Sequence, residues 1–200
     1  MKRGICIGLM GLLVSGFIVG KSIATTSLPL TRLSNPSPTP FPPPERLVIP
    51  KLKLDVPIES VGLDPDGRMA VPQNPSDAGW YQWGPKPGEP GQAVIDGHLD
   101  TATSAAIFWH LNTLKPGDII QVIDSGHVTK TFQVERLKTF KDATFPINEV
   151  FGSTNDSRLN LITCGGTWDI GTKNYSDRLV VFATLAPQRP YRSLGEGGSP

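Results

Sequence analysis

One cysteine stands where a strand and a turn meet, and it is the residue best suited to chemistry. Residues 159–163 form an apolar run with β-branched side chains, which predicts a strand, and Cys164 ends that run. Gly165 and Gly166 follow, so the chain can turn sharply beside the thiol. The other cysteine, Cys6, lies in an apolar N-terminal segment, which leaves Cys164 without a disulfide partner in the folded part of the chain. This local pattern fits either a buried structural thiol or a nucleophile.

A nucleophilic thiol needs a partner that favours or generates the thiolate, and the chain has three histidines. His127 falls in a predicted hairpin turn, where a solvated role is favoured. His110 lies in a short helical stretch, where a packed or capping role is favoured. His98 ends a predicted buried strand. Because two strand ends can meet at one rim of a barrel, we take His98 and Cys164 as a working Cys/His pair.

Attack of a thiol on an acyl carbon also needs a cation or hydrogen-bond donors for the developing oxyanion. Arg178 stands at the head of the last predicted strand, fourteen residues after Cys164. A strand, a loop and a return strand would bring both residues to the same end of a sheet. The alternative is a surface ion pair between Arg178 and Asp177, which would contribute little to stability.

The elements that must position these residues are short strands. Turn signals recur at short intervals along the chain. Residues 72–91 contain five prolines and four glycines and are predicted to be loop, while residues 105–111 have a helical pattern of barely two turns. The pattern indicates an all-β sandwich or closed barrel of seven or eight strands. The predicted strands span residues 47–49, 54–58, 92–98, 119–123, 128–137, 159–163 and 179–185.

Residues 1–24 are a candidate membrane helix. Lys2 and Arg3 precede an uncharged run that begins at Gly4 and ends at Gly20. The run is longer than the core of a typical signal peptide, so we expect residues 1–24 to be an uncleaved anchor, with a cleaved signal peptide as the alternative. The positive-inside rule then keeps the N-terminus in the cytoplasm and exports everything downstream.

Composition separates the remaining segments. Residues 25–46 contain seven prolines and are predicted to be an extended, semi-rigid stalk. Residues 47–187 form the predicted β domain, and residues 188–200 form a polar tail. The net charge of +1 provides no basic field for nucleic acid. Two cysteines fit neither a disulfide scaffold nor a four-ligand zinc site. No metal-ligand spacing appears elsewhere in the chain, so no metal and no cofactor are assigned.

Three stretches together resemble the sortase family. They are Gly-His-Leu-Asp at 97–100, Leu-Ile-Thr-Cys-Gly-Gly at 161–166 and Tyr-Ser-Asp-Arg-Leu-Val-Val-Phe-Ala at 175–183. The Cys-Gly-Gly and His-x-Asp forms are most similar to class F sortases. The likeness spans residues 47–186, which is most of the chain. One position departs from the family pattern, since Asn160 stands where sortases commonly carry threonine; we expect this to tune the strand without loss of activity.

The resemblance implies a closed eight-stranded sortase-type β-barrel that acts as a cysteine transpeptidase. Cys164 would be the nucleophile that attacks the carbonyl after threonine in a Leu-Pro-x-Thr-Gly-like motif. His98 would protonate the leaving amine and later deprotonate the incoming one, and Arg178 would stabilise the oxyanion or position the substrate. The implied partners are secreted proteins with a C-terminal sorting motif and an amine of the cell wall, or water, that resolves the thioacyl intermediate. The implied location is the bacterial cell membrane, with a single-pass anchor and an extracellular catalytic domain.

Two other functions remain open at this point. A cysteine peptidase that only hydrolyses would share the Cys/His chemistry, and a stalked, surface-displayed binding module would need Cys164 to be buried and unreactive. A further pattern lies in the stalk, where residues 28–31 read Leu-Pro-Leu-Thr, the first four residues of a sorting motif. Coincidence in a linker rich in proline and threonine is the favoured explanation. The alternative is a weak pseudo-substrate that occupies the peptide groove.

Overall fold

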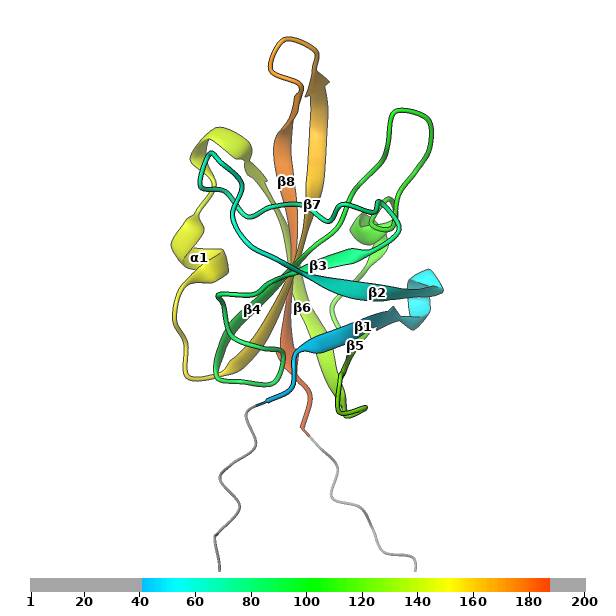
Figure 1. Cartoon of the computed structure of the whole chain (residues 1–200), viewed down its shortest axis with the longest axis vertical. Coiled ribbons are helices and arrows are strands. Elements are labelled where there is room, and N and C mark those ends of the chain that lie inside the picture. The colour runs from blue at the N-terminus through cyan, green and yellow to red at the C-terminus, as the bar shows by residue number, and fades with distance from the viewer. Residues whose placement is uncertain (1–40, 188–200) are drawn as a thin grey trace, which may run out of the picture. The chain divides into compact units, whose positions relative to one another are not determined.

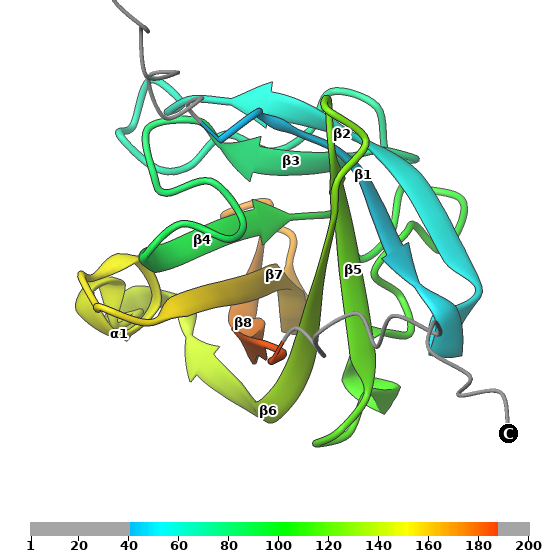
Figure 2. The same cartoon turned by 90° about the horizontal axis from the view of Figure 1, so that it is seen from below.

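Eight strands close into a barrel in the computed structural model of the chain, which describes residues 41–187 (Figure 1). The strands neighbour one another in the order β1-β2-β3-β4-β7-β8-β6-β5, and β5 pairs with β1 to close the ring (Figure 2). The strands are β1 (Pro44–Ile49), β2 (Leu54–Val61), β3 (Ala78–Tyr81), β4 (Gly91–Asp96), β5 (Ile119–Asp124), β6 (Thr129–Lys141), β7 (Ser157–Asp169) and β8 (Asn174–Leu185). The predicted closed, eight-stranded all-β barrel is therefore confirmed.

The helical elements are short. Three are 3-10 turns and one is an α-helix of five residues: η1 (Pro50–Leu52), η2 (Leu111–Thr113), η3 (Asp142–Thr144) and α1 (Ile147–Phe151). The helical pattern predicted at 105–111 thus yields only a turn that leads into η2. The helix α1 lies outside the barrel beside β4, in the connection between β6 and β7 (Figure 2).

The sheet is mixed, and its parallel and antiparallel pairs determine which residues become neighbours. β4 runs parallel to β7, with Asp96 opposite Ile162. β7 and β8 form an antiparallel hairpin, with Cys164 opposite Arg178. The register therefore sets the end of β4, which precedes His98, level with the part of β7 that precedes Cys164, although β7 itself continues to Asp169.

Two apolar clusters lie on the two faces of the sheet. Alternation along β7 directs Leu159 and Leu161 into the main cluster inside the barrel, where both are fully buried. Ile162 faces the other way and joins a smaller outer cluster that includes Val150 of α1 and Val180 of β8. Because side chains two residues apart share a face, Cys164 lies on the same outer face as Ile162, and Arg178 on the same face as Val180.

One strand was not predicted. Residues 72–91 were expected to be loop, yet Ala78–Tyr81 forms β3, which pairs parallel to β2 and antiparallel to β4. Four residues are too few for a visible alternation, and the prolines and glycines on both sides resemble a loop. The pairing with β2 is a contact between distant segments, so the local sequence does not contain it. Trp80 of this strand is buried in the barrel and donates its indole N–H to the carbonyl of Pro85, 3.1 Å away.

The predicted anchor at 1–24, most of the stalk, the Leu-Pro-Leu-Thr segment and the tail at 188–200 lie outside the described residues. Within residues 41–187, no helix has the length and apolar character needed to cross a membrane.

At one end of the barrel, the amide of Ser125 in the β5–β6 turn donates to the carbonyl of Pro43. The end of β8 is fixed nearby, since the amide of Ala186 donates to the carbonyl of Thr131.

Candidate active site

Cys164 lies in the middle of β7, directly before a break in the regular pairing of the β7–β8 hairpin. The register shifts between Gly165 and Trp168, and Gly166 adopts a positive φ of 76°. A side chain at Gly166 could not be accommodated, because its Cβ would overlap Ser176 and lie 2.7 Å from Cγ of Asp177. Gly166 therefore permits a bulge that redirects the hairpin shortly after the thiol, whereas a Cβ at Gly165 would make only ordinary contacts, the nearest at 3.8 Å.

His98 follows the end of β4 and is held by backbone contacts of its neighbours. The buried hydroxyl of Thr163 donates to the carbonyl of Gly97 at 2.7 Å, and the amide of Gly97 donates to the carbonyl of Ile162 at 3.1 Å. A Cβ at Gly97 would lie 2.5 Å from Phe108, so only glycine fits there. These contacts join the residue before His98 to the residues before Cys164.

The tautomer of His98 follows from its partner. Nε2 lies 2.9 Å from the carbonyl oxygen of Pro72, which can only accept, so Nε2 carries the hydrogen. In the neutral ring Nδ1 is then the basic nitrogen. Among residues 41–187 no hydrogen bond joins His98 to Cys164, although both side chains line one pocket.

Arg178 is fixed by a network that joins β8 to η3. Its Nη1 donates to the backbone carbonyls of Asp177 at 2.9 Å and Tyr175 at 3.1 Å. Nη2 donates to Oδ1 of Asn174 at 2.8 Å and forms an ion pair with Oδ1 of Asp142 at 3.0 Å. Asn174 in turn donates to the other carboxylate oxygen of Asp142 at 2.8 Å. The carboxylate of Asp177 is engaged elsewhere, 2.8 Å from Nζ of Lys141. Arg178 therefore has its ion pair with Asp142 of η3 and not with the adjacent aspartate.

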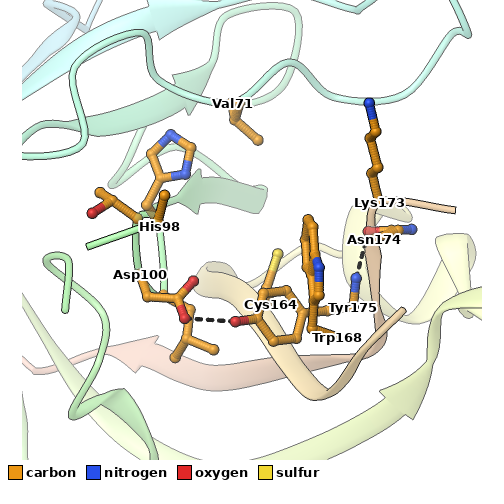
Figure 3. Close-up of a pocket in the computed structure, with 11 residues that line it drawn as sticks. Val71, His98, Asp100, Cys164, Trp168, Lys173, Asn174 and Tyr175 are labelled. Atoms are coloured by element: carbon orange, nitrogen blue, oxygen red, sulfur yellow. Dashed lines mark hydrogen bonds between the residues drawn. The ribbon is translucent and has the colours of Figure 1, made fainter. Parts of the chain in front are cut away.

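A pocket of about 540 Å³ opens beside the thiol (Figure 3). His98 and Asp100 lie on one side of it, and the β7–β8 hairpin forms the other side (Figure 3). The hydroxyl of Tyr175 donates to Oδ2 of Asp100 at 2.6 Å and links the two sides. The Tyr175 ring also packs edge-to-face on Trp168, with ring centroids 5.2 Å apart. A second pocket of about 250 Å³ also reaches Cys164, on the side of Trp109 and Leu179.

The charges around the thiol favour its protonated form. Burial raises the pKa of Cys164 above its ordinary value, the guanidinium of Arg178 opposes that rise, and the carboxylates of Asp96, Asp100 and Asp142 add to it. Loss of solvent also raises the pKa of Asp96 to about 7, which Arg178 offsets only in part. A thiol in this setting needs a base to become a nucleophile.

The amino-acid sequence matches the family model of the sortase domain over residues 47–186. The chain belongs to the sortase family. Sortases are cysteine transpeptidases that act on sorting-motif substrates, and they are typically anchored in the membrane. A search of curated protein sequences gives no match to this sortase.

Solved sortase structures share the fold. Sortase C1 from Streptococcus agalactiae superposes with a TM-score of 0.57 at 21% identity, over 72% of this chain and 68% of that one. Sortase C-1 from Actinomyces oris gives 0.55 at 26% identity, over 71% and 73%. Sortase A from Corynebacterium diphtheriae gives 0.56 at 22% identity, over 76% and 64%. These neighbours belong to classes A and C, so the resemblance to class F stays a prediction.

The departure from the family pattern at Asn160 has a structural role in this sortase. Asn160 is fully buried on β7 and donates to Oε1 of Gln92 at 2.9 Å and to the carbonyl of Val150 at 2.7 Å. Gln92 on β4 donates to the carbonyl of Gly152 at 2.9 Å. The amide pair thus fastens α1 to the two strands that lead to His98 and Cys164.

Four site residues were not assigned a role from the sequence: Asp100, Asp142, Asn174 and Tyr175. Three of them lie within or beside the family stretches, and the aspartate of the His-x-Asp form was a usable signal for Asp100. Asp142 carried no local signal, because it meets Arg178 only through the pairing of β6 with β8. No group of three His, Cys, Asp or Glu side chains within residues 41–187 is arranged to hold a metal ion.

Proposed function

We propose that this sortase cleaves a Leu-Pro-x-Thr-Gly-like sorting motif through a thioacyl intermediate on Cys164 and transfers the acyl group to an amine of the cell wall. The observation that carries the proposal is the register that sets Cys164 opposite Arg178, together with the pocket that Cys164 shares with His98. A thiol, a base and a cation near the thiol supply the nucleophile, the proton transfer and the oxyanion stabilisation that acyl transfer through a thioester uses.

The first half of the reaction forms the thioester. In the proposed mechanism, Nδ1 of His98 takes the thiol proton because Nε2 is occupied by the carbonyl of Pro72. The thiolate attacks the carbonyl carbon after threonine, and the guanidinium of Arg178 stabilises the negative oxygen. The protonated ring then gives its proton to the leaving amine, and the C–N bond breaks.

The second half returns the free enzyme. An incoming amine attacks the thioester carbon, gives a proton to His98, and displaces Cys164 as the thiolate, which then takes that proton from His98 and becomes the thiol again. Water can attack in the same way, so a purely hydrolytic peptidase is the alternative outcome. The alternative of a binding module is disfavoured, since Cys164 is partly exposed and lines two pockets.

We further propose that this sortase is of class F, that residues 1–24 anchor it in the bacterial membrane, and that the barrel lies outside the cell. The Cys-Gly-Gly and His-x-Asp forms support the class, and the charge pattern of residues 1–24 supports the location.

One assay tests the reaction. The protein is incubated with a labelled sorting peptide, with and without an amine acceptor, and the products are identified by mass spectrometry. We expect cleavage with both a transfer product and a hydrolysis product, and no cleavage by Cys164→Ala, whose fold should be intact by circular dichroism. Cys6→Ala is the matched control and should cleave normally. Cleavage by Cys164→Ala would contradict the mechanism, and hydrolysis without any transfer would favour the peptidase.

A further inference from the structure

The pocket that contains His98 also contains a carboxylate, that of Asp100. Since the leaving amine and the incoming amine both exchange protons with His98, the same pocket must receive the incoming amine. This inference about the incoming amine rests on the proposed function. The amine that arrives is an ammonium ion at neutral pH, because an alkyl ammonium such as that of lysine has a pKa of about 10.4.

Asp100 works against the first half of the reaction. Its negative charge adds to the raised pKa of the Cys164 thiol and so makes the thiolate harder to form. Its carboxylate is nevertheless held in place, with Oδ2 accepting the hydroxyl of Tyr175 at 2.6 Å. A fixed anion beside a nucleophile that must itself become an anion is useful only if another step of the reaction needs it.

The other oxygen of this carboxylate remains available. Within residues 41–187, no donor forms a hydrogen bond to Oδ1 of Asp100, and no ion pair engages its carboxylate, although Lys173 lines the same pocket. The aromatic rings of Trp168 and Tyr175 form the facing wall, which also suits a cation. Next to the thioester position, the pocket therefore presents the Asp100 carboxylate, whose Oδ1 is free to accept a hydrogen bond, and an aromatic surface.

We propose that Asp100 binds the ammonium group of the acceptor substrate and that Tyr175 positions the Asp100 carboxylate for this contact. The second substrate of this sortase is thus selected as a cationic primary amine. In the transfer step the bound ammonium gives one proton to Nδ1 of His98 and its nitrogen forms the C–N bond. The C–S bond breaks, Cys164 leaves as the thiolate and takes the second nitrogen proton, and His98 releases the first one to solvent.

The test compares an acceptor that is charged with one that is not. Full-length protein acts on a labelled sorting peptide at pH 7.5 with either propylamine, which is an ammonium ion there, or hydroxylamine, which is largely uncharged. The measured quantity is the ratio of transfer to hydrolysis at a fixed acceptor concentration below saturation. This ratio reports only on the fate of the thioester and not on the rate at which it forms.

We expect Asp100→Asn to lower the ratio for propylamine about tenfold, the scale of one lost charge-assisted hydrogen bond, and to change the ratio for hydroxylamine by less than about twofold. Tyr175→Phe keeps the ring against Trp168 and should give a smaller loss that is likewise confined to propylamine. The matched control is Glu45→Gln, an exposed carboxylate of β1 outside both pockets, which should leave both ratios unchanged.

The outcomes separate this inference from the proposed function. Equal losses for both acceptors in Asp100→Asn, or no loss for either, would overturn the role of Asp100 while leaving the transpeptidase intact. If Asp100→Asn fails to fold, Tyr175→Phe decides by the same criterion. If the wild-type protein releases no product with amines or with water, the proposed function fails and the acceptor site fails with it.

Discussion

Two of the candidate catalytic side chains, His98 and Arg178, are oriented by partners that the reaction does not change. His98 is fixed through Nε2 by a backbone carbonyl, and Arg178 through Nη2 by Asn174 and Asp142. Nη1 also donates to the carbonyls of Tyr175 and Asp177, so the planar guanidinium is held at both terminal nitrogens and its orientation is fixed, which a flexible ammonium cannot achieve. These partners therefore set the orientation of the His98 ring and of the Arg178 guanidinium as well as the charge around them.

Arg178→Lys tests that argument. The lysine keeps the charge and loses the planar fork, so we expect the kcat/KM of peptide cleavage to fall on the order of 10²-fold, the loss typical of one missing oxyanion donor. Asp177→Ala is the comparison, because its carboxylate pairs with Lys141 and not with Arg178, and it should have a much smaller effect. Equal and small losses in the two variants would mean that Arg178 is a surface residue without a role in cleavage.

At the scale of the elements, β4 and β7 set the distance between His98 and Cys164. The link between them nearest the site is the hydroxyl of Thr163 on the carbonyl of Gly97, and it is fully buried. A buried hydrogen bond contributes about 1 kcal/mol, and a carbonyl left without its donor adds to the loss. The same hydrogen bond also fixes the position of the peptide group between Gly97 and His98.

Thr163→Val removes this hydroxyl and keeps the shape of the side chain. We expect a loss of about 1–2 kcal/mol in the free energy of unfolding, measured with urea, and a fall in kcat that exceeds any change in KM. Thr113→Val provides the control, because it removes an exposed hydroxyl that donates to the carbonyl of His110 at 2.8 Å. A variant with unchanged kcat would show that the Thr163 bond serves stability alone.

The sequence could predict elements whose signal is local, and it missed those that depend on distant contacts. The apolar runs before Cys164 and before Gly97 predicted the first part of β7 and most of β4. The prediction that the strand ends at Cys164 was wrong, because β7 continues beyond the two glycines to Asp169. The strand β3 and the helix α1 were not predictable, because four or five residues give no measurable period. In addition, β3 depends on pairing with β2 and β4, and α1 depends on packing against β4 and β7. Asn160 looked like a mild departure from a motif, and only its contact with Val150 reveals that it anchors α1.

At the scale of the whole molecule, closing the barrel gathers carboxylates around one thiol. Asp96 comes from β4, Asp100 from the loop that follows it, and Asp142 from η3, and all three raise the pKa of Cys164. Asp142 has Arg178 as a partner and Asp100 has Tyr175. The Asp96 carboxylate accepts no hydrogen bond from residues 41–187, and the charge of Arg178 offsets its desolvation only in part, so the ionised carboxylate destabilises the folded barrel.

This destabilisation predicts how stability depends on pH. The pKa of Asp96 is about 7 in the folded protein and near its ordinary 3.8 in the unfolded chain. Between these values the folded state binds a proton that the unfolded state has lost, so this residue makes the free energy of unfolding fall as pH rises from about 4 to about 7. Asp96→Asn is neutral at every pH and removes that fall. Relative to wild type, the variant should therefore gain on the order of 2 kcal/mol between pH 5 and pH 8 in urea unfolding, below the full ~1.36 kcal/mol per pKa unit because Asp96 is partly exposed.

The control for this prediction is Asp118, whose pKa is shifted in the opposite direction to that of Asp96. A hydrogen bond from Lys51 lowers the pKa of Asp118, so that carboxylate is ionised in both folded and unfolded chains from pH 5 to pH 8. The stability difference between Asp118→Asn and wild type should therefore stay constant across this range, whatever its size. The difference for Asp96→Asn should grow over the lower part of the range and level off above pH 7, because the folded state then holds an ionised carboxylate as well. Parallel pH curves for wild type and Asp96→Asn would mean that the Asp96 carboxylate reaches water freely and that the outer face of β4 is open at that point.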